Sequence, residues 1–123
     1  MSQHWALYWT IKPGTEQKVR ELFKNYERPD PVVRDADGNE KGLLVGTQVF
    51  MKGNVIVRVM EIEGALPDVA AHLGRQPEIQ ALETELDAYL EEPRDMSDPE
   101  GARKFFMRTM MEPLLSRRHD DPD

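Results

Sequence analysis

The sequence of 123 residues contains no cysteine, and this absence removes several kinds of chemistry at once. Disulfide bonds, thiolate catalysis and cysteine metal sites are all excluded. No apolar run approaches the roughly 20 residues that a membrane span needs, so we expect no membrane association. The first residues, MSQHWALYW, lack a basic start, an apolar stretch and a small-residue cleavage site, so we expect no signal peptide and a cytoplasmic location.

A basic surface patch is also missing from this acidic chain, whose formal net charge is −7. The densest basic pair, Arg117-Arg118, lies among aspartates close to the last residue. Nucleic acid would be repelled by such a chain, so we expect no nucleic-acid partner. The length fits one domain, which we place at residues 1–115, followed by a disordered acidic tail over 116–123.

Clusters of histidine and carboxylate residues at metal-binding spacing are absent, and so is a glycine-rich phosphate loop. The chain therefore gives no reason to expect a metal ion or an organic cofactor. Any reaction would have to depend on ordinary side chains and the reactivity of the substrate itself.

Two β-rich runs between Leu43 and Glu63 are separated by Gly53-Asn54, and this stretch predicts a tight antiparallel hairpin. With that turn, the ladder pairs Met51 with Ile56, Val49 with Arg58, Thr47 with Met60 and Val45 with Ile62. Both hairpin faces are mainly apolar, whereas a sheet with one side in water should alternate. Helices can cover one face, and the other needs a ligand, a partner subunit or a closed barrel.

Helical and strand periodicities fill most of the remaining chain. They predict a strand over 4–12, a helix from Thr15 to about Tyr26, a helix that ends at Gly74 and another that begins at Pro77. Residues 35–42 read as a polar turn segment and 91–101 as an exposed linker.

Residues 102–111 fit two patterns. Methionine favours a helix, whereas alternation of Phe105, Met107 and Thr109 with Phe106 and Arg108 favours a strand. We favour the strand, because a fourth strand completes the order β-α-β-β-α-(α)-β. The predicted fold class is therefore α+β and ferredoxin-like, with a four-stranded antiparallel sheet and helices on one face.

The order of these elements, together with VFMKGNVIVRVMEIEGALPDVAAHLGRQPEIQALETELDAYL and the later GARKFFMRTMM, resembles the SchA/CurD-like family of small actinobacterial proteins. The resemblance implies a dimeric α+β barrel and an association with type II aromatic polyketide pathways, including spore pigment synthesis. Similar small barrels include polyketide cyclases and cofactor-independent oxygenases. The resemblance also implies that a partner subunit covers the second sheet face, and it brings no assigned catalytic residues.

Arg58 and His72 are the candidate catalytic residues. Arg58 shares its predicted face with apolar side chains, and a buried unpaired charge is costly, so it must have a partner or reach water. It is either a structural ion pair or a donor to a polyketide enolate or phenolate. His72, beside the apolar stripe of its helix, is either a capping or solvated residue or a general base.

A planar polycyclic ligand needs flat aromatic walls, adaptable sulfur and a few polar groups. The candidate substrate-binding residues are Trp5, Tyr8, Trp9, Gln48, Phe50, Met60, Phe106, Arg108 and Met110. Most of the aromatic side chains fit core packing equally well. Tyr8 is the exception, because its hydroxyl needs a polar partner.

These observations favour an enzyme that acts on an aromatic polyketide, either a cyclase or a monooxygenase without a cofactor. An electron-rich polyphenol supplies its own electrons once it is deprotonated, so the protein need provide only a base, a donor for the anion and a dry pocket. The competing hypothesis is a non-catalytic homodimer that binds the intermediate or associates with polyketide synthase components. The substrate and the regiochemistry stay open.

Overall fold

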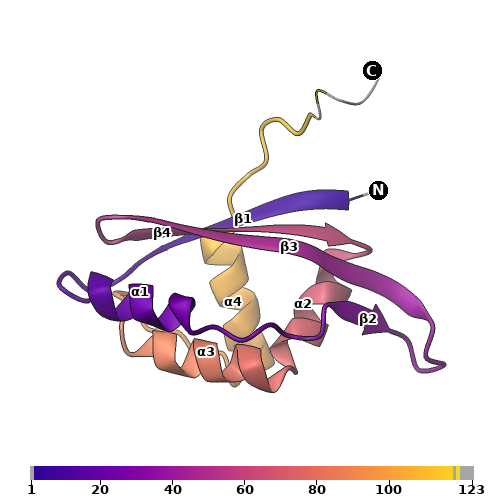
Figure 1. Ribbon diagram of the computed structural model, residues 1–123, viewed down its shortest axis with the longest axis horizontal. Coiled ribbons are helices and arrows are strands. Elements are labelled where there is room, and N and C mark those ends of the chain that lie inside the picture. Colours follow the sequence, from indigo (N-terminus) through magenta and orange to yellow (C-terminus); the bar gives the residue numbers. More distant parts are fainter. Residues whose placement is uncertain (1, 118, 120–123) are drawn as a thin grey trace.

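A four-stranded antiparallel sheet covered by helices on one face forms the body of the molecule (Figure 1). We describe it from a computed structural model, which covers residues 2–117 and 119. The elements are β1 (Ser2–Thr10), α1 (Glu16–Lys24), β2 (Val32–Arg34), β3 (Glu40–Lys52), β4 (Val55–Glu63), α2 (Leu66–Gly74), α3 (Pro77–Asp87) and α4 (Pro99–Thr109). The strand order is β1-β4-β3-β2. The predicted α+β, ferredoxin-like class with helices on one face is confirmed.

The β3–β4 hairpin is the centre of the sheet. Gly53 has a φ of 58° in its turn, a conformation that glycine adopts without strain. Three predicted pairs are confirmed, those of Met51 with Ile56, Val49 with Arg58 and Thr47 with Met60.

The fourth predicted pair is wrong, because a bulge at Val45 shifts the register. Ile62 pairs with Leu44 instead, and Glu61 pairs with Gly46. An extra residue in one strand exchanges the sheet faces to which the side chains beyond it point. Leu44 therefore faces the helices, where it is buried, and Val45 is exposed to solvent.

The strand predicted over 102–111 is wrong, since these residues belong largely to helix α4. Asp98 caps the helix by accepting a hydrogen bond from the Glu100 backbone N–H, and Pro99 occupies its first turn. Phe105 and Thr109 lie one turn apart and are the buried residues of this helix. Helical spacing, rather than alternation, therefore describes this segment.

The fourth strand is β2, within a region where the sequence predicted no strand. It pairs with β3 on the far edge of the sheet, and an irregularity lies between Val33 and Arg34. On the β1 edge, where a ferredoxin-like fold would place its last strand, only a short contact forms after α4. Met110 bridges Leu7, and the Met111 N–H donates to the Ala6 carbonyl at 2.8 Å.

The core fills the layer between the sheet and the helices. Its most deeply buried side chains come from nearly every element: Leu7, Ile11, Val19, Val33, Ile56, Ile62, Val69 and Leu86. Within the part of the chain that the structure describes, no helix has both the length and the apolar character needed to cross a membrane. Most of the predicted disordered tail over 116–123 lies outside the described residues, and its disorder stays a prediction.

The opposite face of the sheet, which we call the open face, has no helix over it (Figure 1). It carries an apolar row formed by Tyr8, Val57 and Phe50. Tyr8 and Phe50 both pair with Val57, one from each neighbouring strand. Tyr8 is 47% exposed and Phe50 57%, values that are high for large apolar side chains.

Candidate functional site

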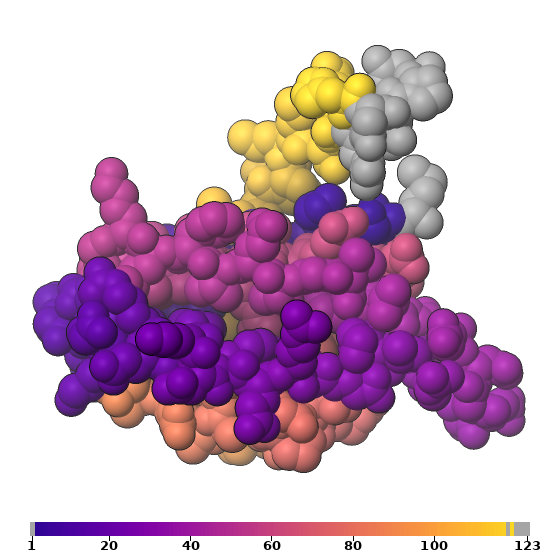
Figure 2. Space-filling view, viewed as in Figure 1, coloured from indigo at the N-terminus to yellow at the C-terminus, as the bar shows by residue number. Residues whose placement is uncertain are grey.

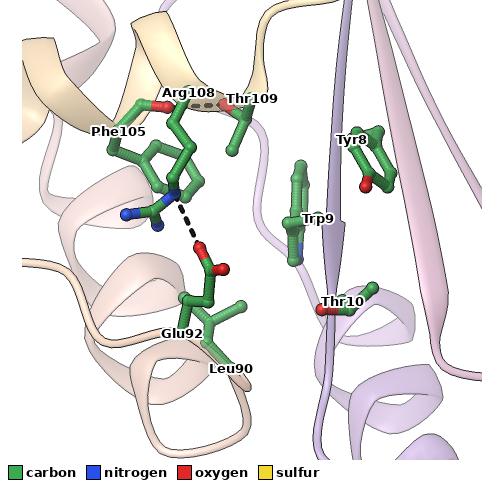
Figure 3. Close-up of a pocket in the computed structure, with 8 residues that line it drawn as sticks. All are labelled: Tyr8, Trp9, Thr10, Leu90, Glu92, Phe105, Arg108 and Thr109. Carbon is green, nitrogen blue, oxygen red and sulfur yellow. Dashed lines mark hydrogen bonds and ion pairs between the residues drawn. The ribbon is translucent and has the colours of Figure 1, made fainter.

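A small pocket lies between the end of β1 and helix α4, and aromatic rings line it (Figure 3). Its volume is about 120 Å³. A cavity of roughly 150 Å³ accommodates benzene, so this somewhat smaller pocket has room for one aromatic ring at most. Its lining residues are Tyr8, Trp9, Thr10, Leu90, Glu92, Phe105, Arg108 and Thr109.

The pocket combines an aromatic wall with a positive charge. The rings of Trp9 and Phe105 lie 6.2 Å apart at an interplanar angle of 56°. The Arg108 guanidinium carbon lies 5.6 Å from the Phe105 ring centroid, and its Nε forms an ion pair with a Glu92 oxygen at 3.0 Å (Figure 3). The Trp9 indole N–H is buried without a partner among the described residues. An aromatic ligand bearing an oxygen anion would find a flat wall here and the terminal N–H groups of Arg108 as donors.

A second guanidinium, that of Arg94 in the segment between α3 and α4, also packs on the Phe105 ring. Arg94 lies 4.4 Å from the ring centroid, and its side chain is only 2% exposed. It pairs with Glu83 at 2.5 Å and with Asp87 at 2.6 Å, both on α3. The prediction that 91–101 is an exposed linker is therefore wrong at Arg94, which ties this segment to α3 and to α4.

Arg58 belongs to the same group of charges, and it lies on the helix-covered face. Its side chain is 10% exposed, and its Nη1 lies 3.5 Å from a Glu83 oxygen. Glu83 therefore bridges two arginines, one on β4 and one in the segment after α3. The expectation that Arg58 has a partner or reaches water is confirmed by this pair. Its Nε is buried without a partner within the described residues, which leaves one donor free.

Tyr26, after α1, also approaches these charges. Burial raises the pKa of its phenol above 10.0; Arg58 opposes the rise, and Glu83 and Glu78 add to it. Its hydroxyl is buried and has no hydrogen-bond partner in the described part of the chain. The phenol therefore stays neutral in the folded protein well into alkaline conditions.

His72 lies on α2 and has partners of its own. Its Nε2 is 2.8 Å from the Asp30 carbonyl, which can only accept, so Nε2 carries the proton. Gln76 lies 3.3 Å from the same nitrogen. His72 and Arg58 therefore contact different partners, and neither is among the eight residues that line the pocket. Their catalytic roles stay predictions.

The other predicted binding residues fall into three places. Trp9 and Arg108 line the pocket, and Tyr8 borders it from β1, although its ring points to the opposite side of the strand from Trp9 (Figure 3). Trp5, Met60, Phe106 and Met110 pack in or against the core, with Met60 buried. Gln48 and Phe50 lie on the open face.

Five lining residues were missed by the sequence interpretation: Thr10, Leu90, Glu92, Phe105 and Thr109. Helical spacing of Phe105, Arg108 and Thr109 was the available signal for the α4 side of the pocket. Glu92 gave no local signal, because its partner Arg108 lies on another element.

A wider groove of about 930 Å³ runs between α1 and α3. Apolar side chains such as Leu22 and Leu82 line it together with four glutamates, Glu21, Glu27, Glu78 and Glu85. This concentration of carboxylates opposes a phenolate or enolate. The β1–α4 pocket is therefore the better site for an anionic aromatic ligand.

The fold and the pocket define a small ferredoxin-like α+β domain with a ring-sized aromatic site beside arginines. A model of the SchA/CurD like domain matches residues 2–118, and the chain belongs to this family, as the resemblance indicated. No solved structure matches the chain.

Three curated Streptomyces proteins are similar to it. "Polyketide synthase CurD" of Streptomyces cyaneus is 41% identical over 125 residues, covering 93% of this chain and 33% of that protein. The "42.8 kDa protein in whiE locus" of Streptomyces coelicolor is 43% identical over 106 residues, 86% of this chain and 25% of that protein. "Protein SchA" of Streptomyces halstedii is 36% identical over 106 residues, 86% of this chain and 27% of that protein. The chain thus spans a third or less of the relatives' length.

Proposed function

We propose that this chain acts in aromatic polyketide biosynthesis and binds one ring of a polyphenolic intermediate in the β1–α4 pocket. The observation that carries the proposal is the position of Arg108 over Phe105, beside Trp9, in a pocket the size of one ring. The relative named as a polyketide synthase supports the pathway.

The proposed reaction is either ring cyclisation or oxygenation by dioxygen without a cofactor. The aromatic wall orients the ring, and Arg108 stabilises the phenolate or enolate that forms when the substrate loses a proton. That stabilisation favours the electron-rich anion. In cyclisation the anion attacks a carbonyl carbon, and the carbonyl oxygen leaves as water when the new ring becomes aromatic. In oxygenation the anion transfers electrons to dioxygen, one oxygen atom enters the ring to give a quinone, and the other leaves as water. Arg58 stays the candidate second donor, and His72 the candidate base.

A non-catalytic binding role is the second candidate, and a specific feature favours it. Arg108 and Arg94 both pair with carboxylates, so neither charge is wholly available to a reacting anion. A pocket for one ring would then hold the intermediate for another enzyme, including polyketide synthase components. Such a protein would bind the intermediate without changing it.

One experiment separates these roles. Purified protein is mixed with the polyphenolic intermediate under air and under argon, and the products are separated by chromatography. A changed product pattern under both gases indicates cyclisation, a change only under air indicates oxygenation, and quenching of tryptophan fluorescence without any new product indicates binding alone. The proposal is rejected if the protein shows no quenching and forms no new product.

Matched variants locate the site in the same assay. Arg108→Gln should weaken the quenching and any product formation. Arg103→Ala should change neither, because Arg103 is a well-exposed arginine on the same helix. Arg58→Ala and His72→Ala test the two predicted catalytic residues. If both variants stay folded and convert substrate at the parent rate, those assignments are wrong.

We also propose that the protein is a cytoplasmic homodimer in which a second copy covers the open face. The exposed Tyr8 and Phe50 beside Val57 support this, because burial of large apolar side chains drives association. Light scattering at micromolar concentration tests it, and a monomeric mass would reject it.

A further inference from the structure

We propose that residues 112–117, which we call the C-terminal arm, pack on the open face of a second copy through Leu114 and Leu115. The inference deepens the proposed homodimer and rests on it. It assigns the contact that holds the two copies together to a named segment, so it can fail while the dimer itself stands.

The arm leaves the body of the protein at the β1 edge. Met110 bridges Leu7, and the Met111 N–H donates to Ala6 at 2.8 Å. Pro113 has no N–H to continue the ladder. Beyond it, the chain stands off from the body on the side of the sheet away from the helices (Figures 1 and 2).

The arm exposes two adjacent aliphatic side chains to water. Leu114 is 87% exposed and Leu115 76%, more than any other large apolar side chain of the described residues. Two neighbouring leucines that stay exposed to water contribute no hydrophobic stabilisation to a monomer. Burial against an apolar surface would account for them.

The arm's own sheet offers the wrong surface for these leucines. Since Met110 and Met111 run antiparallel to β1, the arm heads toward the first residues of that strand. On the open face these residues form a polar group, in which Glu61 accepts from Ser2 at 2.7 Å and lies 3.6 Å from His4. The apolar row of Tyr8, Val57 and Phe50 lies in the opposite direction along the strands.

A second copy presents that apolar row to the arm when the two open faces meet. Six extended residues span about 20 Å. Neighbouring strands lie about 4.8 Å apart, so this length crosses a four-stranded sheet. The arm of each copy would thus lie across the sheet of the other, and the contact is reciprocal, as a twofold dimer requires.

The test uses the absence of native cysteine, which makes introduced pairs unambiguous. Leu115→Cys is combined with Gln48→Cys, an exposed position of the open face, and oxidised mildly at micromolar concentration. The expected product on a non-reducing gel is a covalent dimer. The control pairs Leu115→Cys with Thr84→Cys, an exposed position on helix α3, and should give at least tenfold less dimer.

Each outcome decides the inference. An intramolecular disulfide would show that the arm folds onto its own sheet and would overturn it, as would equal dimer yields from both pairs. Light scattering of the unmodified chain separates the two proposals. If the unmodified chain is a dimer but the 48–115 disulfide does not form between copies, the arm contact is rejected and the homodimer stands.

A second variant avoids the disulfide altogether. Leu114→Ser with Leu115→Ser should raise the dimer dissociation constant at least tenfold and leave the circular dichroism of the fold unchanged, because both side chains are exposed in one copy. An unchanged dissociation constant would overturn the inference.

Discussion

Arg94 provides the sharpest test of how this fold is held together. Its side chain, 2% exposed, pairs with Glu83 and Asp87 and stacks on Phe105. Arg94→Ala removes all three contacts at once. We expect a large loss of stability, although the residue lies outside every helix and strand.

The size of the stability loss depends on which contacts Glu83 and Asp87 retain in the variant. Removing one member of a buried ion pair costs about 3–5 kcal/mol. Glu83 keeps Arg58 at 3.5 Å, and Asp87 is 41% exposed and can be hydrated, so we take the lower end of that range. Loss of the guanidinium from the Phe105 face adds about 1 kcal/mol. The expected cost is about 4 kcal/mol.

Chemical denaturation of the parent and the variant measures this difference, and the midpoint of thermal unfolding should fall by roughly 15 °C. Arg103→Ala is the matched control. That side chain is 69% exposed in a 3.9 Å pair with Glu100, so its loss should cost under about 0.5 kcal/mol. The loss of stability in Arg94→Lys should lie between the losses in these two variants, because one ammonium group cannot make the several planar contacts of a guanidinium. If Arg94→Ala and Arg103→Ala unfold within about 1 kcal/mol of each other, the ion-pair reasoning is refuted.

Three further predictions test the pocket and the packing. Arg108→Gln should weaken binding of an ionised phenol about tenfold by calorimetry, yet change the free energy of unfolding by under about 1 kcal/mol, because the side chain is 43% exposed; equal affinity would remove Arg108 from the site. Tyr26→Phe should unfold within about 1 kcal/mol of the parent near neutral pH, because its hydroxyl has no partner in the described chain. Since the folded pKa of Tyr26 is raised, its contribution is fully present below pH 10.0 and is lost as pH rises through the folded value; denaturation at alkaline pH should show a loss in the parent that the phenylalanine variant lacks. Gly101→Ala should cost about 2 kcal/mol or more, because its Cβ would collide with the Asp95 carbonyl, whereas Gly74→Ala meets nothing and should be neutral in the same unfolding assay.

The hairpin was predictable because its determinants are local. A glycine in the turn and two β-rich runs define both strands and most of the register. The bulge at Val45 was not predictable from this pattern, since alternation counts residues and cannot show where one is extra. Leu44 and Val45 are both apolar, so exchanging their faces leaves the pattern unchanged.

Helix α4 was mistaken for a strand because the fold argument took precedence over the helix signals. Asp98-Pro99 is a typical helix start, and Phe105 and Thr109 have helical spacing. The expectation of a last strand beside β1 favoured alternation instead. In the structure that edge is met by Met110 and Met111 and, near its end, by Glu91, whose N–H donates to the Thr10 carbonyl, and these short contacts stand in place of a full strand. The sequence signals at Asp98 were therefore the better guide.

The candidate site shows why catalytic roles were harder to predict than the fold. Glu83 joins Arg58 on β4 to Arg94, and Arg94 in turn supports the Phe105 wall of the pocket. A change at Arg58 therefore reaches the pocket through two charged side chains, even without any contact between Arg58 and the ligand. Loss of turnover in Arg58→Ala would by itself be ambiguous. A variant that lowers kcat but keeps the affinity for the ring would mark Arg58 as a donor to the reacting anion, whereas a parallel loss of affinity and stability would mark it as a positioning residue.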